Sequence, residues 1–162
     1  DEFIITPPLF RLDAKSQNIL RIIATNAQNL QTDKESLFLL NVKAIPAKST
    51  EQSSQNVLQI ALKTTIKLFY RPAGLQGSLQ ETVEKLQWRA EGGHLTVHNP
   101  SGFNVVVSDL LINNKASQGM PEVIKPGDTV TTAIPLKNSD KLELTYINEY
   151  GSTVKAAPIT VH

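Results

Sequence analysis

The chain contains no cysteine, which excludes disulfide bonds and thiolate chemistry but does not identify a cellular compartment. It also lacks an apolar run of about 18 residues, the length needed for a membrane-spanning helix, so no membrane insertion is expected. Its net charge is only +1, which argues against a basic field for nucleic acid or an anionic membrane. With 162 residues, 40% apolar and 19% charged, the composition predicts a globular protein of one large domain or two small ones.

Helix signals of useful length are missing too, and short β-rich runs recur between turn residues instead. Turns are marked by sequences such as NPSG at 99–102 and PGD at 126–128. Many short strands at this spacing indicate an all-β sandwich architecture. The expected strands are Ile4–Leu12, Asn18–Ala24, Ser36–Ile45, Asn56–Arg71, Glu84–Ala90, His94–His98, Asn104–Ile112, Thr129–Ile134, Lys141–Asn148 and Thr153–Val161.

The most informative stretch is NVLQIALKTTIKLFYRP at 56–72, which alternates almost without a break. Period-two patterning of this length predicts a strand over 56–71 with one apolar face. Strands in globular proteins usually have about 5 or 6 residues, so this one has a surplus end that can serve a partner. The apolar parity holds Leu58, Ile60, Leu62, Ile66, Leu68 and Tyr70.

The run from Pro72 to Gly74 breaks this strand and is the predicted hinge between two domains, 1–72 and 73–162. The polar run 47–55 connects two strong strands and predicts a flexible hairpin loop. An immunoglobulin-like domain takes about 100 residues and seven strands. Only four strands are expected before Pro72, so the first domain is expected to be incomplete in this chain.

A series of short motifs resembles one known family along essentially the whole chain. In order they are TPPLFRL at 6–12, NILRI at 18–22, ESLF at 35–38, NVKAIP at 41–46, IKLFYRP at 66–72, LTVHNP at 95–100 and INEYG at 147–151. They are similar to the periplasmic chaperones of the chaperone–usher pilus pathway, the PapD-like family, and most of all to chaperones of type 1 and S-type fimbriae. The resemblance implies two immunoglobulin-like domains set in a boomerang, with a cleft between them. It also implies further strands before the TPPLF segment, so the chain is expected to be a fragment.

The family's function would make this protein a chaperone for pilin subunits in the periplasm of a Gram-negative bacterium, which passes them to the outer-membrane usher. Members donate a strand to a pilin, a mode of binding in which backbone hydrogen bonds satisfy an open sheet edge. By this resemblance Leu58, Ile60 and Leu62 are the donor side chains that enter the pilin groove. The alternation by itself favours the simpler interpretation that all three belong to this protein's own core.

The resemblance also assigns charged residues to the cleft. Lys67 matches the lysine that binds the carboxylate at the pilin carboxy terminus, whereas the pattern alone indicates a solvated strand lysine. The family's second cleft cation is an arginine on a first strand that this sequence does not contain. Glu35, Arg71 and Glu149 match an interdomain ion network, although the family more often has aspartate at the last position. The short connector between Ile45 and Asn56 is typical of chaperones that assemble rod-like pili.

Enzyme interpretations fail because the residues they need are absent. There is no glycine-rich phosphate loop and no nucleophile motif, and no cofactor is expected. His94 and His98 could share a strand face, but no third ligand stands at metal spacing. The lysines are too scattered to indicate a nucleic-acid surface.

The alternative function is a structural or adhesive two-domain β-sandwich, such as a surface-fibre subunit. Exposure of Leu58, Ile60 and Leu62 distinguishes the two, because a self-contained sandwich should bury these side chains whereas a free chaperone should expose them. An exposed apolar strand is also sticky, so a self-capping dimer is expected for the free chaperone.

Overall fold

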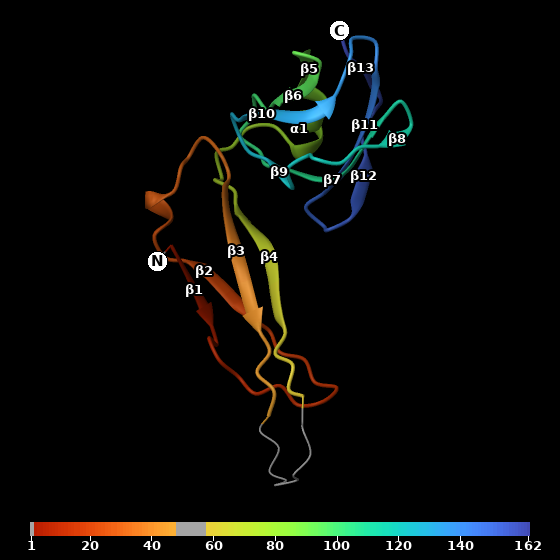
Figure 1. Cartoon of the computed structure of the whole chain (residues 1–162). Coiled ribbons are helices and arrows are strands. Elements are labelled where there is room, and N and C mark those ends of the chain that lie inside the picture. The colour runs from red at the N-terminus through yellow and green to blue at the C-terminus, as the bar shows by residue number, and fades with distance from the viewer. Residues whose placement is uncertain (1, 48–57) are drawn as a thin grey trace.

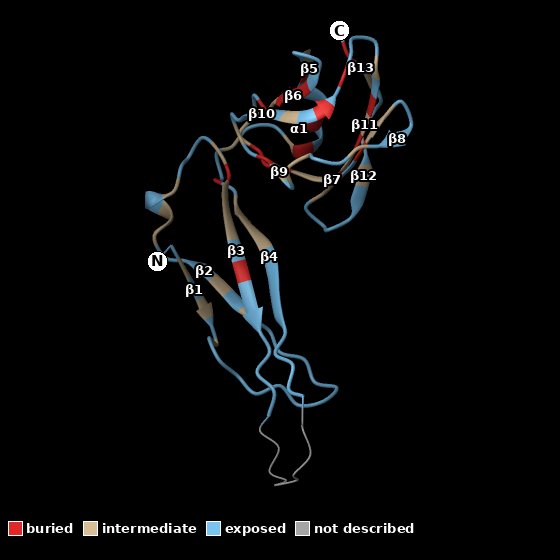
Figure 2. Cartoon of the chain, in the orientation of Figure 1, coloured by how far each residue is buried: buried red, intermediate tan, exposed pale blue. Residues whose placement is uncertain are grey.

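The computed structural model describes residues 2–47 and 58–162, which form two groups of strands joined near residue 72 (Figure 1). The amino-terminal group holds β1 to β4, and the carboxy-terminal group holds β5 to β13 with one helix. Buried residues are concentrated in the carboxy-terminal group, as Figure 2 shows. No helix in the described ranges has the length and apolar character needed to cross a membrane.

Two separate two-stranded sheets make up the amino-terminal group. β1 (Phe3–Thr6) pairs with β2 (Arg21–Ala24), and β3 (Ser36–Lys43) pairs with β4 (Lys63–Tyr70), with a short 3-10 turn at Ala27–Asn29 between the two sheets in sequence. The sheets meet where the ring of Phe3 packs edge-on against Phe38, with 4.8 Å between ring centroids. Among the described residues before Pro72, Leu40 is the only large apolar side chain that is buried. This half therefore holds little of the apolar burial that stabilises a fold.

A two-sheet sandwich forms the carboxy-terminal group. One sheet has the order β10 (Thr129–Pro135), β6 (His94–His98) and β5 (Gln87–Glu91). The other is built on β7 (Val105–Ile112) and β11 (Lys141–Ile147), to which the short strands β8 (Lys115–Ala116), β9 (Val123–Ile124), β12 (Thr153–Lys155) and β13 (Ile159–Thr160) are paired. Side chains such as Leu95, Val105 and Leu142 are at most 1% exposed between the sheets. The carboxy-terminal group therefore holds nearly all of the buried apolar side chains of the described chain.

The expectation of a strand over Glu84–Ala90 with no useful helix is wrong in part. The helix α1 (Leu79–Lys85) occupies the first positions, and β5 begins only at Gln87. Ser78 caps the helix by accepting a hydrogen bond from the Glu81 backbone N–H at 3.2 Å. A serine followed three residues later by glutamate is the capping-box signature, so this helix start could have been found in the sequence.

The predicted strand over 56–71 is also wrong in its extent, because β4 covers only Lys63–Tyr70. Its partner β3 ends at Lys43, and one further backbone bond links the Ala44 N–H to the Leu62 carbonyl at 2.8 Å. Continued in the same register, the next residues of that partner would place Pro46, which has no N–H, opposite Ile60. The pairing therefore stops, and 58–62 are not in a strand. Positions 56 and 57, and all of the expected loop 47–55 except Ala47, lie outside the described residues.

Proline limits two other predicted strands. The strand expected over Ile4–Leu12 ends at Thr6, directly before Pro7 and Pro8. The strand expected over Thr153–Val161 is divided into β12 and β13 by a segment that contains Pro158. Both interruptions follow from the missing proline N–H, which cannot take part in a sheet ladder.

Candidate binding cleft

A cavity of about 430 Å³ lies where the end of β4 meets the carboxy-terminal group. Lys67, Phe69 and Arg71 line it from the amino-terminal side. Val106 from β7 and Ile147 from β11 line it from the other side. The cavity thus combines apolar walls with charged groups, and its position between the two groups of strands corresponds to the predicted cleft.

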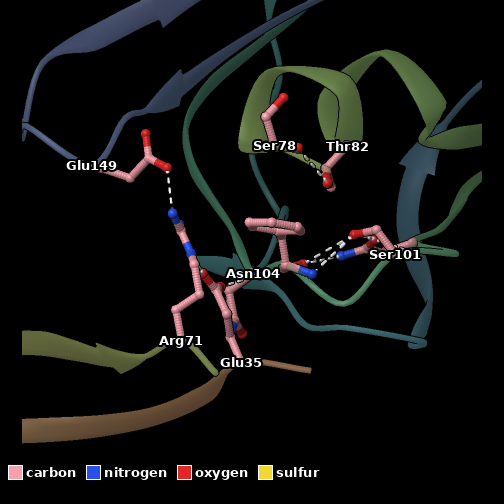
Figure 3. A network of polar contacts seen from close by, with 9 residues as sticks. Glu35, Arg71, Ser78, Thr82, Ser101, Asn104 and Glu149 are labelled. Atoms are coloured by element: carbon pink, nitrogen blue, oxygen red, sulfur yellow. Dashed lines mark hydrogen bonds and ion pairs between the residues drawn. The ribbon is translucent and has the colours of Figure 1, made fainter. Parts of the chain in front are cut away.

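Arg71 makes contacts with both groups of strands. Its Nε donates a hydrogen bond to Glu35 Oε1 at 2.8 Å, and its Nη1 donates to Glu149 Oε1 at 2.9 Å (Figure 3). The guanidinium also lies 4.8 Å from the ring centre of Phe103, within the range of a cation–π contact. Partial burial acts to lower the pKa of Arg71, but the hydrogen bonds and charges of Glu35 and Glu149 outweigh it and raise the pKa above its ordinary value. The structure therefore brings together the three residues that the sequence analysis grouped as an ion network.

Glu35 is the buried member of this network, with only 6% of the residue exposed. Its Oε2 accepts hydrogen bonds from the Asn104 backbone N–H at 2.8 Å and from Asn104 Nδ2 at 3.2 Å (Figure 3). Its own N–H donates to the Gly102 carbonyl at 2.8 Å. A buried carboxylate is stable only when its oxygens are satisfied in this way. Glu35 therefore joins the two groups of strands by backbone and side-chain bonds together.

Gly102, Phe103 and Asn104 also contact Glu35 or Arg71 across the boundary between the two groups of strands, and no sequence motif assigns them to it. From the sequence, NPSG at 99–102 is expected to be a turn and Asn104 the first residue of a strand, with no contact to Glu35 indicated for either. Asn99, fully buried, donates to the carbonyls of Phe103 and Ile124, and its Oδ1 accepts from the Ser101 N–H at 3.0 Å. The asparagine thus shapes the turn that presents Asn104 to Glu35. An asparagine followed by proline in a turn was the available signal, but it does not say what the turn contacts.

Replacing Gly102 with alanine is expected to lower the free energy of unfolding by about 1–3 kcal/mol, the usual cost of overpacking. A Cβ at this position would stand 2.7 Å from the Asp33 carbonyl oxygen and 2.6 Å from Leu75 Cδ1, and the backbone atom cannot move without disturbing the bond to Glu35. Thermal unfolding checks this. Gly74→Ala is the matched control, since a Cβ there meets nothing within 4 Å. Equal melting temperatures for both variants would contradict the tight approach at Gly102.

Lys67 lies in the cleft, with its side chain 30% exposed. Its Nζ stands 3.0 Å from Glu122 Oε2, whose side chain is 84% exposed. Glu122 comes directly before β9 in the carboxy-terminal group, so this pair also bridges the two groups. Nothing in the sequence pattern indicates Glu122, because it lies in an irregular segment far along the chain from its partner.

Leu58, Ile60 and Leu62 lie away from the cleft and line none of its cavity. They are 84%, 65% and 66% exposed, so they are not part of a core in the described structure. They continue the chain of β4 beyond Lys63, at the end opposite to Arg71. The predicted donor residues and Arg71 therefore lie at opposite ends of one segment, and Lys67 lies between them.

The fold and the cleft define a two-domain immunoglobulin-like β protein, with an ion network between the domains and an exposed apolar segment directly before β4. Residues 1–76 match the family model for the pili and flagellar-assembly chaperone, PapD N-terminal domain, and residues 81–157 match that for the pili assembly chaperone PapD, C-terminal domain. The chain belongs to this PapD-like family of pilus assembly chaperones, as the resemblance in its motifs predicted. The predicted all-β fold of two immunoglobulin-like domains is confirmed, and the boundary at residue 72 stays a prediction.

Individual relatives agree with the family models. The chain is 42% identical over 151 residues to the probable fimbrial chaperone LpfB of Escherichia coli O157:H7, which covers 93% of this chain and 65% of LpfB. It is 39% identical to the chaperone protein MrkB of Klebsiella pneumoniae over 164 residues, 98% of this chain and 70% of MrkB. A solved structure of the Salmonella enterica SafA pilin in complex with the SafB chaperone matches with a TM-score of 0.86 and 27% identity, over 99% of this chain and 75% of the matched chain. The chain thus spans slightly less than two thirds of the length of LpfB.

Proposed function

We propose that this protein is a periplasmic chaperone that binds pilin subunits by donor-strand complementation, prevents their aggregation and passes them to the outer-membrane usher. The observation that carries the proposal is that β4 has an unpaired edge and is preceded by exposed apolar side chains. In the described part of the chain β4 pairs with β3 alone, so its other edge offers unpaired backbone groups. An incoming pilin strand can pair with that edge, while exposed apolar side chains just beyond it enter the pilin.

Leu58, Ile60 and Leu62 have the properties that donor side chains need. They alternate along the chain, and an extended segment therefore directs all three to one face. Burial of each in an apolar groove would contribute roughly 1.5–3 kcal/mol before the cost of ordering the segment. Their exposure supports the chaperone over the alternative of a self-contained structural or adhesive sandwich, which should bury them.

Lys67 is the proposed anchor for the carboxylate at the pilin carboxy terminus. It lies in the cleft, between the proposed donors and the Arg71 network, and its ammonium reaches a carboxylate already. A charge-assisted bond to a chain terminus would fix the register of the added strand, because it holds one end of that strand at one place. Similarity to a chaperone solved in complex with the SafA pilin supports a pilin as the partner.

The remaining parts of the proposal follow from membership of the family. Handover to the usher requires no ATP in this scheme, since the next subunit replaces the donated strand. The periplasm of a Gram-negative bacterium is the proposed location. The exposed apolar side chains of 58–62, directly before β4, also favour a self-capping dimer of the free protein, in which two copies cover each other's donor residues.

Co-expression in the periplasm with donor-strandless pilins, followed by pull-down of the tagged chaperone, tests the function. The mature protein that carries this chain should retain a pilin, and Lys67→Ala should retain at least tenfold less, because hydrogen bonds to charged groups contribute about 1.5–3 kcal/mol. Lys63→Ala is the matched control, since Lys63 is an exposed lysine on the same strand and does not line the cavity.

The outcomes separate the parts of the proposal. Loss of pilin with Lys67→Ala but not with Lys63→Ala supports a chaperone anchored through the cleft. Equal retention by all three proteins keeps the chaperone and removes Lys67 as its anchor. Failure of the unaltered protein to retain any of several pilins favours the structural sandwich.

A further inference from the structure

We infer that Glu122 is an internal competitor for the Lys67 ammonium. An incoming carboxylate must displace Glu122 from Lys67, so Glu122 influences how tightly the cleft holds a chain terminus. This inference rests on the proposed function of Lys67 and adds a residue from the other domain to it. It starts from one contact, the 3.0 Å approach of Lys67 Nζ to Glu122 Oε2.

The side chains of Lys67 and Glu122 differ in how far they are exposed to solvent. The Lys67 side chain is 30% exposed and lines the cavity, whereas the Glu122 side chain is 84% exposed and is not among the cavity's lining residues. Glu122 can therefore rotate into solvent at little cost, while Lys67 stays in the cleft. An exposed ion pair contributes little to stability, so its loss does not endanger the fold. This asymmetry makes Glu122 the displaceable partner of the pair.

The backbone of Glu122 is held, which keeps its carboxylate available. Its carbonyl accepts a hydrogen bond from the Val107 N–H at 2.9 Å, and the following residues Val123 and Ile124 pair with β7. Val106, the neighbour of Val107 on that strand, lines the same cavity as Lys67. A hydrogen-bonded backbone next to the cleft keeps the exposed Glu122 carboxylate at high local concentration beside the Lys67 ammonium, where it competes with an incoming carboxylate.

The other cleft cation cannot serve an incoming carboxylate in the same way. Arg71 is held by Glu35 and Glu149 together, and Glu35 is buried and bonded to Asn104 as well. Displacing Glu35 would leave a buried charge unpaired, which is costly. Among the described cationic groups that line the cleft, Lys67 is thus the one whose carboxylate partner can be replaced cheaply. An incoming chain terminus therefore exchanges with Glu122.

Glu122→Gln tests the inference, because it keeps the shape of the side chain and removes its charge. Pilin dissociation from the immobilised mature protein is measured for the unaltered protein, Glu122→Gln, Lys67→Ala and the double variant. Glu122→Gln is expected to bind pilin roughly three- to fivefold more tightly, the size of effect that an exposed ion pair can exert. In the Lys67→Ala background the same change should have no effect. Glu91→Gln, an equal change of charge on the exposed end of β5 in the other sheet, should also have none.

Each outcome decides one way. Tighter binding that depends on Lys67 supports the inference, as does pilin retention by Glu122→Gln where the unaltered protein retains none. Unchanged or weaker binding by Glu122→Gln overturns it. If Lys67→Ala still loses pilin in that case, the proposed function stands and only the role of Glu122 is lost. If no variant retains any pilin, the proposed function and this inference both fall.

Discussion

The Ile60→Asp variant is expected to lose pilin binding by at least a hundredfold while its carboxy-terminal domain stays folded. Ile60 is the middle one of the three proposed donors and is 65% exposed in the free protein, so the change leaves the chaperone's own packing intact. In the complex the same position would enter an apolar groove. Burial worth roughly 1.5–3 kcal/mol would be lost, and an unpaired carboxylate would have to be desolvated in its place. Pull-down and the dissociation rate of the pilin measure this.

Ile19→Asp is the control for that experiment. Ile19 is 84% exposed and does not belong to a strand, so the same new charge is placed on a side chain that is at least as exposed as Ile60. It should retain pilin at the level of the unaltered protein. If Ile60→Asp retains pilin equally well, the assignment of the donor residues is wrong.

The second large effect is expected for Arg71→Ala, which should lower the free energy of unfolding by about 3 kcal/mol. Removing the guanidinium leaves the Glu35 carboxylate, whose side chain is 3% exposed, without its cation. The variant also loses the bond to Glu149 and the contact with Phe103, and both of these cross to the carboxy-terminal domain. Urea unfolding followed by tryptophan fluorescence is a suitable measurement, since Trp88 is buried in the carboxy-terminal core.

Arg11→Ala provides the comparison for Arg71. Arg11 also forms an ion pair, with Asp13 at 3.0 Å, but the two side chains are 90% and 73% exposed. Exposed pairs are worth about 0–1 kcal/mol, so this variant should unfold nearly as the unaltered protein does. If Arg71→Ala and Arg11→Ala lower the free energy of unfolding by similar amounts, burial of Glu35 does not determine the strength of the Arg71 ion network.

Local patterns located most of the strands but not where several of them end, and they missed the short helix. Alternation identified the segment that contains β4, but the sequence pattern did not reveal that Pro46 would end the pairing opposite Ile60. The helix α1 was missed because its seven residues are too few for a helical period to stand out, although Ser78 and Glu81 carried a capping signal. Short elements depend on their ends and their packing more than on their own periodicity.

The cleft was predictable only in part for a similar reason. The family resemblance of the IKLFYRP motif pointed to Lys67 and Arg71, and the same resemblance assigned Glu35 and Glu149 as acidic partners of Arg71. Glu122 was beyond reach, because a carboxylate in an irregular segment acquires a partner only when the fold brings the two domains together. The contact at Gly102 depends on the close approach of its backbone to the backbone of Asp33 and Glu35, and a pattern of side chains does not indicate such an approach.

The position of Lys67 on β4 gives the chain a built-in measure of length. In an extended segment the cleft lysine stands about 17 Å from Leu62, since each residue advances the chain by about 3.3 Å. A pilin strand whose carboxy terminus is bound at Lys67 thus has each of its residues at a fixed distance from the apolar positions at 58–62. In the proposed function, a pilin binds well only if its apolar groove lies at the right distance from its carboxy terminus. A groove of suitable chemistry at another distance would not meet Leu58, Ile60 and Leu62.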